Sequence, residues 1–204
     1  MGESLDTWIT RFTTEIDNLR AALEWSLASQ KASSFELGLQ LMSSFGRLWQ
    51  LHSFLRDGLA YLTRFLTAPP DGLGKHPYAE GLNLAAELSL RMRDYTETRN
   101  FANEALRIGH ELNDAKLVGD ACRSLADEAL RWDDFTNGHS YAHLALESYQ
   151  KIRDPLRSAL ALNLLGIREV MAGDLTTGYT HLTTALDIAR SLRMKFLFPA
   201  SYMV

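Results

Sequence analysis

Apolar residues in the first part of the chain recur at steps of three and four. The stripe consists of Leu5, Trp8, Ile9, Phe12, Ile16, Leu19, Leu23 and Leu27. This spacing predicts one amphipathic α-helix from Leu5 to Ser29, because residues three and four apart share a helix face. Since such a stripe needs a surface to cover it, residues 1–34 are expected to form an N-terminal cap on the helices that follow.

The rest of the chain repeats itself at a step of 40 residues. The step is seen in Asp94-Tyr95-Thr96, Asp134-Phe135-Thr136 and Asp174-Leu175-Thr176. Small residues keep the same step at Ala86, Ala126 and Gly166, and again at Thr98, Gly138 and Gly178. A fixed period of this size is typical of stacked helical repeats.

Each repeat is interpreted as a pair of helices. The apolar residues between Leu117 and Arg131 have helical spacing, and Asp134 then stands where the N-cap of a second helix belongs. Small side chains allow two helices to cross closely, and the Tyr, Phe or Leu after each Asp is expected to fill the space between them. The sequence therefore predicts a row of helical hairpins.

This arrangement resembles the tetratricopeptide (TPR) pattern, in which a small residue on the first helix precedes an Asp-aromatic turn and two small residues on the second. The period departs from that pattern, because TPR units have about 34 residues and HEAT or armadillo units about 40 to 47. The resemblance implies an all-α, TPR-like right-handed α-α superhelix (solenoid) over residues 35–204, with HEAT-like units as the alternative. We expect about nine complete helices, and a last repeat truncated after its start at Phe196–Val204.

A second resemblance is carried by the segment Glu15-Ile16-Asp17-Asn18-Leu19-Arg20-Ala21-Ala22-Leu23-Glu24-Trp25. It is similar to a segment of large bacterial regulators in which an NTPase domain of the signal-transducing class precedes TPR-like helices. Many of these regulators, of the LuxR-type or AfsR-like kind, carry a DNA-binding domain. The resemblance implies that the chain is the sensing region of such a regulator, with NTPase and DNA-binding domains as its neighbours.

Composition narrows the classes of function. The net charge of −4 argues against direct contact with nucleic acid, which needs clustered Lys and Arg. The chain has no apolar run of membrane-spanning length and no signal-peptide pattern at its start. Its one cysteine, Cys122, fits a reducing compartment and is expected to be buried. We therefore expect a cytoplasmic protein.

Several motifs that suggest chemistry have simpler explanations. Gly72-Leu73-Gly74-Lys75 lacks the first Gly and the Ser or Thr of a Walker A loop, so Pro69–Pro77 is interpreted as a plain loop. His139 and His143 share a predicted helix face, but no third metal ligand is evident. With no nucleophile or acid–base pair singled out, we expect no enzyme activity, cofactor or metal. Trp8, Trp25 and Trp49 are expected in the core, and Trp132 partly exposed.

A concave groove lined by the first helix of each pair is the remaining candidate site. By register, the residues expected to face it are Arg47, Asn83, Glu87, Arg91, Arg123, Asp127, Arg131 and Asn163. Asn83, Arg123 and Asn163 fall on one repeat position, and both residue types donate several hydrogen bonds to a peptide backbone or carboxylate. The alternative is that these side chains are only solvated.

The sequence thus leads to a non-catalytic sensor or scaffold whose groove binds a protein, a peptide or a small inducer. Two other hypotheses remain open. One is a free-standing TPR adaptor that binds a peptide or protein partner, and the other is a self-association module that forms a homo-oligomer.

Overall fold

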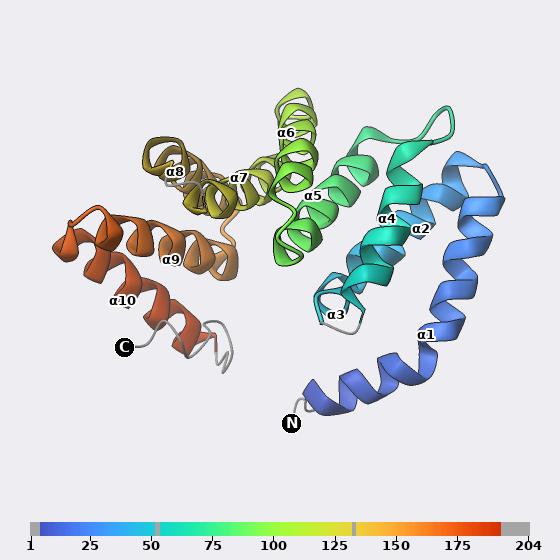
Figure 1. Ribbon diagram of the computed structural model, residues 1–204, viewed down its shortest axis with the longest axis horizontal. Helices are drawn as coiled ribbons and strands as arrows, with labels where there is room; N and C mark the ends of the chain where they lie inside the picture. Colours follow the sequence, from blue (N-terminus) through green and yellow to red (C-terminus); the bar gives the residue numbers. More distant parts are fainter. Residues whose placement is uncertain (1–4, 52–53, 132–133, 193–204) are drawn as a thin grey trace. The chain divides into compact units, whose positions relative to one another are not determined.

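The structure is a computed structural model that describes residues 5–51, 54–131 and 134–192, and all its regular elements in those ranges are α-helices (Figure 1). The helices are α1 (Leu5–Ala28), α2 (Ala32–Ser44), α3 (Gly46–Trp49), α4 (Leu55–Thr67), α5 (Lys75–Arg91), α6 (Tyr95–Glu111), α7 (Ala115–Leu130), α8 (Phe135–Lys151), α9 (Pro155–Met171) and α10 (Leu175–Ser191). The all-α prediction is confirmed. The truncated repeat expected from Phe196 lies outside the described residues.

The chain divides into two compact units, residues 1–104 and 105–204, with the boundary inside α6. In the first unit, α1 packs against α2 and α4, as expected of the N-terminal helix. Ile16, Leu19 and Leu23 of α1 are buried there. None of the helices in the described ranges is long and apolar enough to cross a membrane.

The tryptophan predictions have mixed outcomes. Trp49 is fully buried, as expected, and packs against Gly58. Trp25 is 61% exposed, so its assignment to the core was wrong. The reason is angular, because a helix turns by about 200° over two residues and Trp25 therefore faces away from the buried Leu23. The Trp8 side chain and Trp132 lie outside the part of the chain that is described.

The first helical pair departs from the repeat. The residues one 40-residue step before α5 are 35–51, but here the chain leaves helical geometry at Phe45, where φ is −97° and ψ is 13°. The Phe45 carbonyl then accepts from the Leu48 N–H at 2.8 Å, a tight turn that starts the short α3. The break lets Trp49 enter the core of this unit.

The later helices are joined by one recurring turn. A residue with positive φ ends the helix at Arg93, Asn113, Arg153 and Gly173, and an Asp follows each of them. The N–H of that Asp donates to a carbonyl five residues earlier, as in Asp174 to Glu169 at 2.9 Å. This is the Schellman pattern of helix termination.

The same aspartates cap the next helix. The Asp134 carboxylate accepts from the Asn137 N–H at 3.2 Å, which confirms the predicted N-cap. Asp94 and Asp174 accept in the same way from Glu97 and Thr177, each at 3.1 Å. Between them, Asp114 and Asp154 cap the first helices α7 and α9. Each turn therefore satisfies backbone groups of both helices that it joins.

The second unit has an alanine-rich core, formed by buried residues of α7, α8, α9 and α10. Cys122 lies within it, fully buried as expected, and burial raises the pKa of its thiol to about 12. Helices α9 and α10 lie side by side in Figure 1, and they approach closely at two glycines. A Cβ added to Gly178 would lie 2.9 Å from the Gly166 carbonyl oxygen, and one added to Gly166 would lie 2.9 Å from the Gly178 oxygen. The predicted close crossing is confirmed here.

The guanidinium of Arg168 is buried beside this core. Arg168 of α9 is 2% exposed, and its guanidinium donates to the carbonyl oxygens of Ala126 and Asp134. Burial lowers the pKa of Arg168. A Cβ at Gly138 would lie within about 2 Å of this guanidinium, so glycine at that position makes room for it. The small residue at position 138 thus serves a different neighbour from the one at 178.

Replacing Gly178 with Ala should destabilise the chain. The new methyl group would press on the α9 backbone, a strain of about 1–3 kcal/mol that helix propensity offsets by up to about 1 kcal/mol. Urea unfolding followed by circular dichroism measures the change. Thr184→Ala, on an exposed position of the same helix, is the control and should stay within about 0.5 kcal/mol of wild type. Equal stability of the two variants would show that the α9–α10 crossing accommodates a methyl group at position 178 without strain.

Candidate partner-binding surface

Half of the predicted groove residues lie in the first unit. Asn83, Glu87 and Arg91 follow one another at steps of four on α5, and Arg47 is exposed on α3. Asn83 is only 8% exposed, so little of its side chain is accessible to a partner in this unit. Arg91 reaches the end of α3, where its Nη2 donates to Gln50 Oε1 at 2.7 Å.

The other half lie in the second unit. Arg123 and Asp127 are half-buried on α7, and Arg131 is exposed at its C-cap. Asn163 is half-buried on α9, which packs against α7. The two halves therefore belong to separate units, and the residues on α7 and α9 form one surface within the second unit.

The structure extends the α7 part of this surface with two residues that the sequence analysis missed. Lys116 and Asp120 precede Arg123, Asp127 and Arg131 at steps of three and four, so all five share one side of the helix. These five residues are called the α7 polar face. Four of them are only partly exposed, and the charges alternate in sign along the helix.

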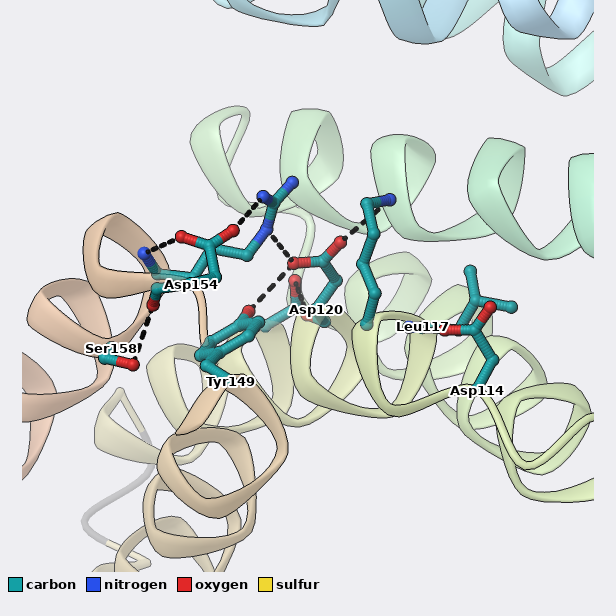
Figure 2. A network of polar contacts seen from close by, with 9 residues as sticks. Asp114, Leu117, Asp120, Tyr149, Asp154 and Ser158 are labelled. Atoms are coloured by element: carbon teal, nitrogen blue, oxygen red, sulfur yellow. Dashed lines mark hydrogen bonds and ion pairs between the residues drawn. The ribbon is translucent and has the colours of Figure 1, made fainter. Parts of the chain in front are cut away.

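A network of polar contacts holds Asp120 in place (Figure 2). Its Oδ1 accepts from the Tyr149 hydroxyl of α8 at 2.8 Å and from Arg157 Nε of α9 at 3.0 Å. Its Oδ2 lies 3.5 Å from Lys116 Nζ. Arg157 is held in turn by Asp154, whose Oδ2 accepts from Nη1 at 2.7 Å. One carboxylate therefore joins three helices.

Local structure places the parts of this network. Asp154 is the N-cap of α9, and Pro155 fits the first turn of that helix, where no backbone donor is needed. Tyr149 is fully buried, and its ring lies against Gly119, where a Cβ would be 2.6 Å away. The sequence does single out Tyr149, because the positions 40 residues before and after it hold the small residues Gly109 and Ala189.

Three members of the network have pKa values shifted by their surroundings. Burial, together with the Asp120 carboxylate, raises the pKa of Tyr149 well above its ordinary value, so its phenol stays a neutral donor. Burial by itself would lower the pKa of Arg157, but Asp120 and Asp154 outweigh it and raise that pKa. Burial would raise the pKa of Asp154, but hydrogen bonds from Arg157 lower it. These groups keep their charge states at neutral pH, which suits recognition.

The matching positions on α9 are mostly apolar. One repeat step from the α7 polar face lie Leu156, Leu160, Asn163, Ile167 and Met171, all half-buried or exposed. Met171 is 52% exposed. Within one unit, α7 thus presents a charged face, and α9 presents an apolar face with the amide of Asn163 in its middle. Such a pair of faces suits an amphipathic segment of a partner.

The two histidines singled out in the sequence have neighbours that were not expected. The His139 and His143 rings lie 4.6 Å apart, edge to face. His139 Nε2 is 3.8 Å from Glu169, and the other oxygen of Glu169 is 2.7 Å from His181 Nδ1. Within the described ranges, no group of three or more His, Cys, Asp or Glu residues is arranged to hold a metal ion.

The glycine-rich segment is a connection between α4 and α5. Gly72 has a φ of +84°, and the Gly74 N–H donates to Glu36 Oε1 at 2.9 Å. In a phosphate-binding loop such an N–H group would donate to a phosphate of the nucleotide. Here the Gly74 N–H donates to the Glu36 carboxylate instead. The loop interpretation is confirmed, although α5 already begins at Lys75.

Removing the Asp120 carboxylate should destabilise the second unit. Asp120→Ala leaves the buried Tyr149 hydroxyl without its acceptor, which we expect to cost about 1–3 kcal/mol in the free energy of unfolding. Asp187→Ala is the matched control, since Asp187 pairs with Arg190 on the surface and is 74% exposed. Urea unfolding of both variants tests this, and equal losses would remove Asp120 from the centre of the network.

Comparison with known proteins shows the fold. No family model matches the sequence, and no curated protein matches it. Among solved structures, the chain is similar to the crystal structure of BtubC (BKLC) from P. vanneervenii, with a TM-score of 0.70 and 19% sequence identity. The match covers 98% of this chain and 79% of that chain. At this identity the likeness concerns the arrangement of helices and carries no function across.

Proposed function

We propose that this chain is a non-catalytic helical-repeat module that binds a protein or peptide partner along its first helices. The observation that carries the proposal is the pairing of the α7 polar face with the apolar positions of α9 in one unit. The Asp120 network holds Arg157 and Lys116 before a partner arrives. Pre-positioned side chains bind with a smaller loss of conformational entropy.

The proposal includes the arrangement of the repeats. A turn that recurs at a constant step is typical of stacked helical hairpins, and this recurrence supports a right-handed superhelix of TPR-like units. The packing of α1 on α2 and α4 supports its role as the N-terminal cap.

We further propose that the module is the sensing region of a multidomain bacterial transcriptional regulator and acts in the cytoplasm. The support is the resemblance carried by residues 15–25. In this scheme a partner that prefers one packing of the hairpins shifts their equilibrium and so biases the attached NTPase and DNA-binding domains. A free-standing adaptor is the alternative.

The partner-binding proposal predicts a selective loss of affinity. Peptides that are charged along one side and apolar along the other should be selected from a random peptide library displayed on phage. The double variant Arg123→Ala, Asn163→Ala should bind them roughly tenfold more weakly, because it loses a guanidinium and an amide donor. Its melting temperature should change little, since neither side chain is part of the core.

The matched control is Gln150→Ala, Arg190→Ala, which changes exposed residues on the second helices α8 and α10. It should bind the selected peptides as wild type does. Binding measured by fluorescence anisotropy decides the matter, and equal affinity of the first double variant would exclude this surface.

The regulator proposal makes a separate prediction about the gene. The reading frame that contains this segment should extend upstream into an NTPase domain with a complete Walker A loop. Sequencing the surrounding gene provides the measurement. A frame that encodes these repeats alone would support the adaptor instead and would leave the partner-binding surface standing.

A further inference from the structure

A hollow of about 370 Å³ lies in the first unit where α1 faces α4. Arg20 of α1 lines it on one side, and Asp57, Ala60, Tyr61 and Arg64 of α4 line the other. The four α4 residues are spaced by three, one and three, so they form one face of that helix. The volume falls within the ~300–1,000 Å³ of small-molecule sites.

Ion pairs between the two helices set the charge of this hollow. Arg20 pairs with Asp57 across the gap and with Asp17 on its own helix at 3.0 Å. Arg64 makes a bidentate pair with Glu24, in which Nη2 donates to Oε2 at 2.8 Å. Each cation thus has an anion beside it, and the lining is close to neutral as a whole.

These pairs leave hydrogen-bonding capacity on both sides. A guanidinium has five N–H donors, and two from each arginine are used in these contacts. A carboxylate has about four acceptor sites, and the Arg20 contact uses Oδ2 of Asp57. The Asp57 and Arg64 side chains are 41% and 50% exposed, so a ligand can reach them from solvent.

The charge balance favours one class of ligand. A simple anion at the remaining N–H donors would lie beside the Glu24 and Asp57 carboxylates and be repelled by them, and a simple cation at Asp57 would be repelled by the arginines. A zwitterion offsets both repulsions, because its carboxylate accepts from the remaining N–H donors while its ammonium donates to Asp57. The Tyr61 ring, with the Arg64 guanidinium 5.5 Å from its centre, offers an apolar surface for the rest of the ligand.

We propose that this hollow is a binding site for a small zwitterion with neighbouring ammonium and carboxylate groups, the chemistry of a free α-amino acid. Arg20 and Arg64 bind the carboxylate, Asp57 binds the ammonium, and Tyr61 contacts the side chain. The site lies between α1 and α4 of the first unit, whereas the α7 polar face belongs to the second unit, and the proposal does not depend on whether that face binds a partner.

The first experiment screens each standard L-α-amino acid at about 5 mM for a rise in melting temperature, since a ligand that binds only the folded state stabilises it. Titration calorimetry then gives the affinity of the best one. The N-acetyl and C-amide forms of that amino acid, inorganic phosphate and acetate serve as comparison ligands. Only the free amino acid should bind. No response to any amino acid, or equal binding of the blocked forms or the simple anions, would overturn the proposal.

Variants locate the site. Asp57→Asn and Arg64→Gln should each weaken binding roughly tenfold by removing one charged contact. Ala60→Phe should abolish binding altogether, because the ring fills the hollow from an exposed position and leaves every ion pair in place. Arg190→Gln on α10 is the control and should bind as wild type does. Far-UV circular dichroism confirms that each variant is folded, and unchanged binding by folded Ala60→Phe would place the ligand elsewhere.

Discussion

The structure depends on the way in which one helix ends and the next begins. At four junctions of the described chain, Arg93, Asn113, Arg153 and Gly173 have a positive φ and are each followed by an Asp at which two kinds of hydrogen bond meet. Its N–H satisfies a carbonyl of the helix before, and its carboxylate satisfies an N–H of the helix after. Because α5 to α10 begin at intervals of 20 residues, positions 40 residues apart correspond on the first helices of successive pairs. The α7 polar face and the apolar positions of α9 are related in this way.

This constraint explains which features the sequence predicted well. Asp134 was recognised as an N-cap, and Gly166 and Gly178 as a close crossing, because both depend on local backbone geometry repeated at a constant step. The break at Phe45 and the exposure of Trp25 were not predicted, since each depends on what the rest of the unit places against the helix. The contacts of Asp120 with Tyr149 and Arg157 span 29 and 37 residues, and no local pattern encodes such a meeting. The candidate site was thus only partly predictable. Its position on the first helices followed from the register, and its network did not.

Both proposed sites are built from arginine–carboxylate pairs between helices. Pairs as exposed as Arg64 with Glu24 contribute little to stability, typically below about 1 kcal/mol. Their effect is geometric, because the planar guanidinium fork is held in one orientation and the remaining donors then point in a defined direction. The Asp120 network differs in that its tyrosine is fully buried, so the same kind of pair is more costly to break there. The first unit can therefore adjust its ion pairs to a ligand more easily than the second can.

Divergence between the repeats shows where specificity can reside in such a fold. Leu88, Glu128 and Arg168 occupy one repeat position, and all three are buried. The turns and the close crossings depend on backbone geometry, so they are compatible with different side chains at this position. The buried side chain must instead match the groups that surround it in its own repeat. Arg168 has Gly138 opposite it and carbonyl oxygens to bind, and a leucine there would leave those oxygens without this donor. The hairpins therefore share their turns and helix crossings but differ in their buried side-chain contacts. A partner or ligand can distinguish one hairpin from the next by these differences, although the backbones repeat.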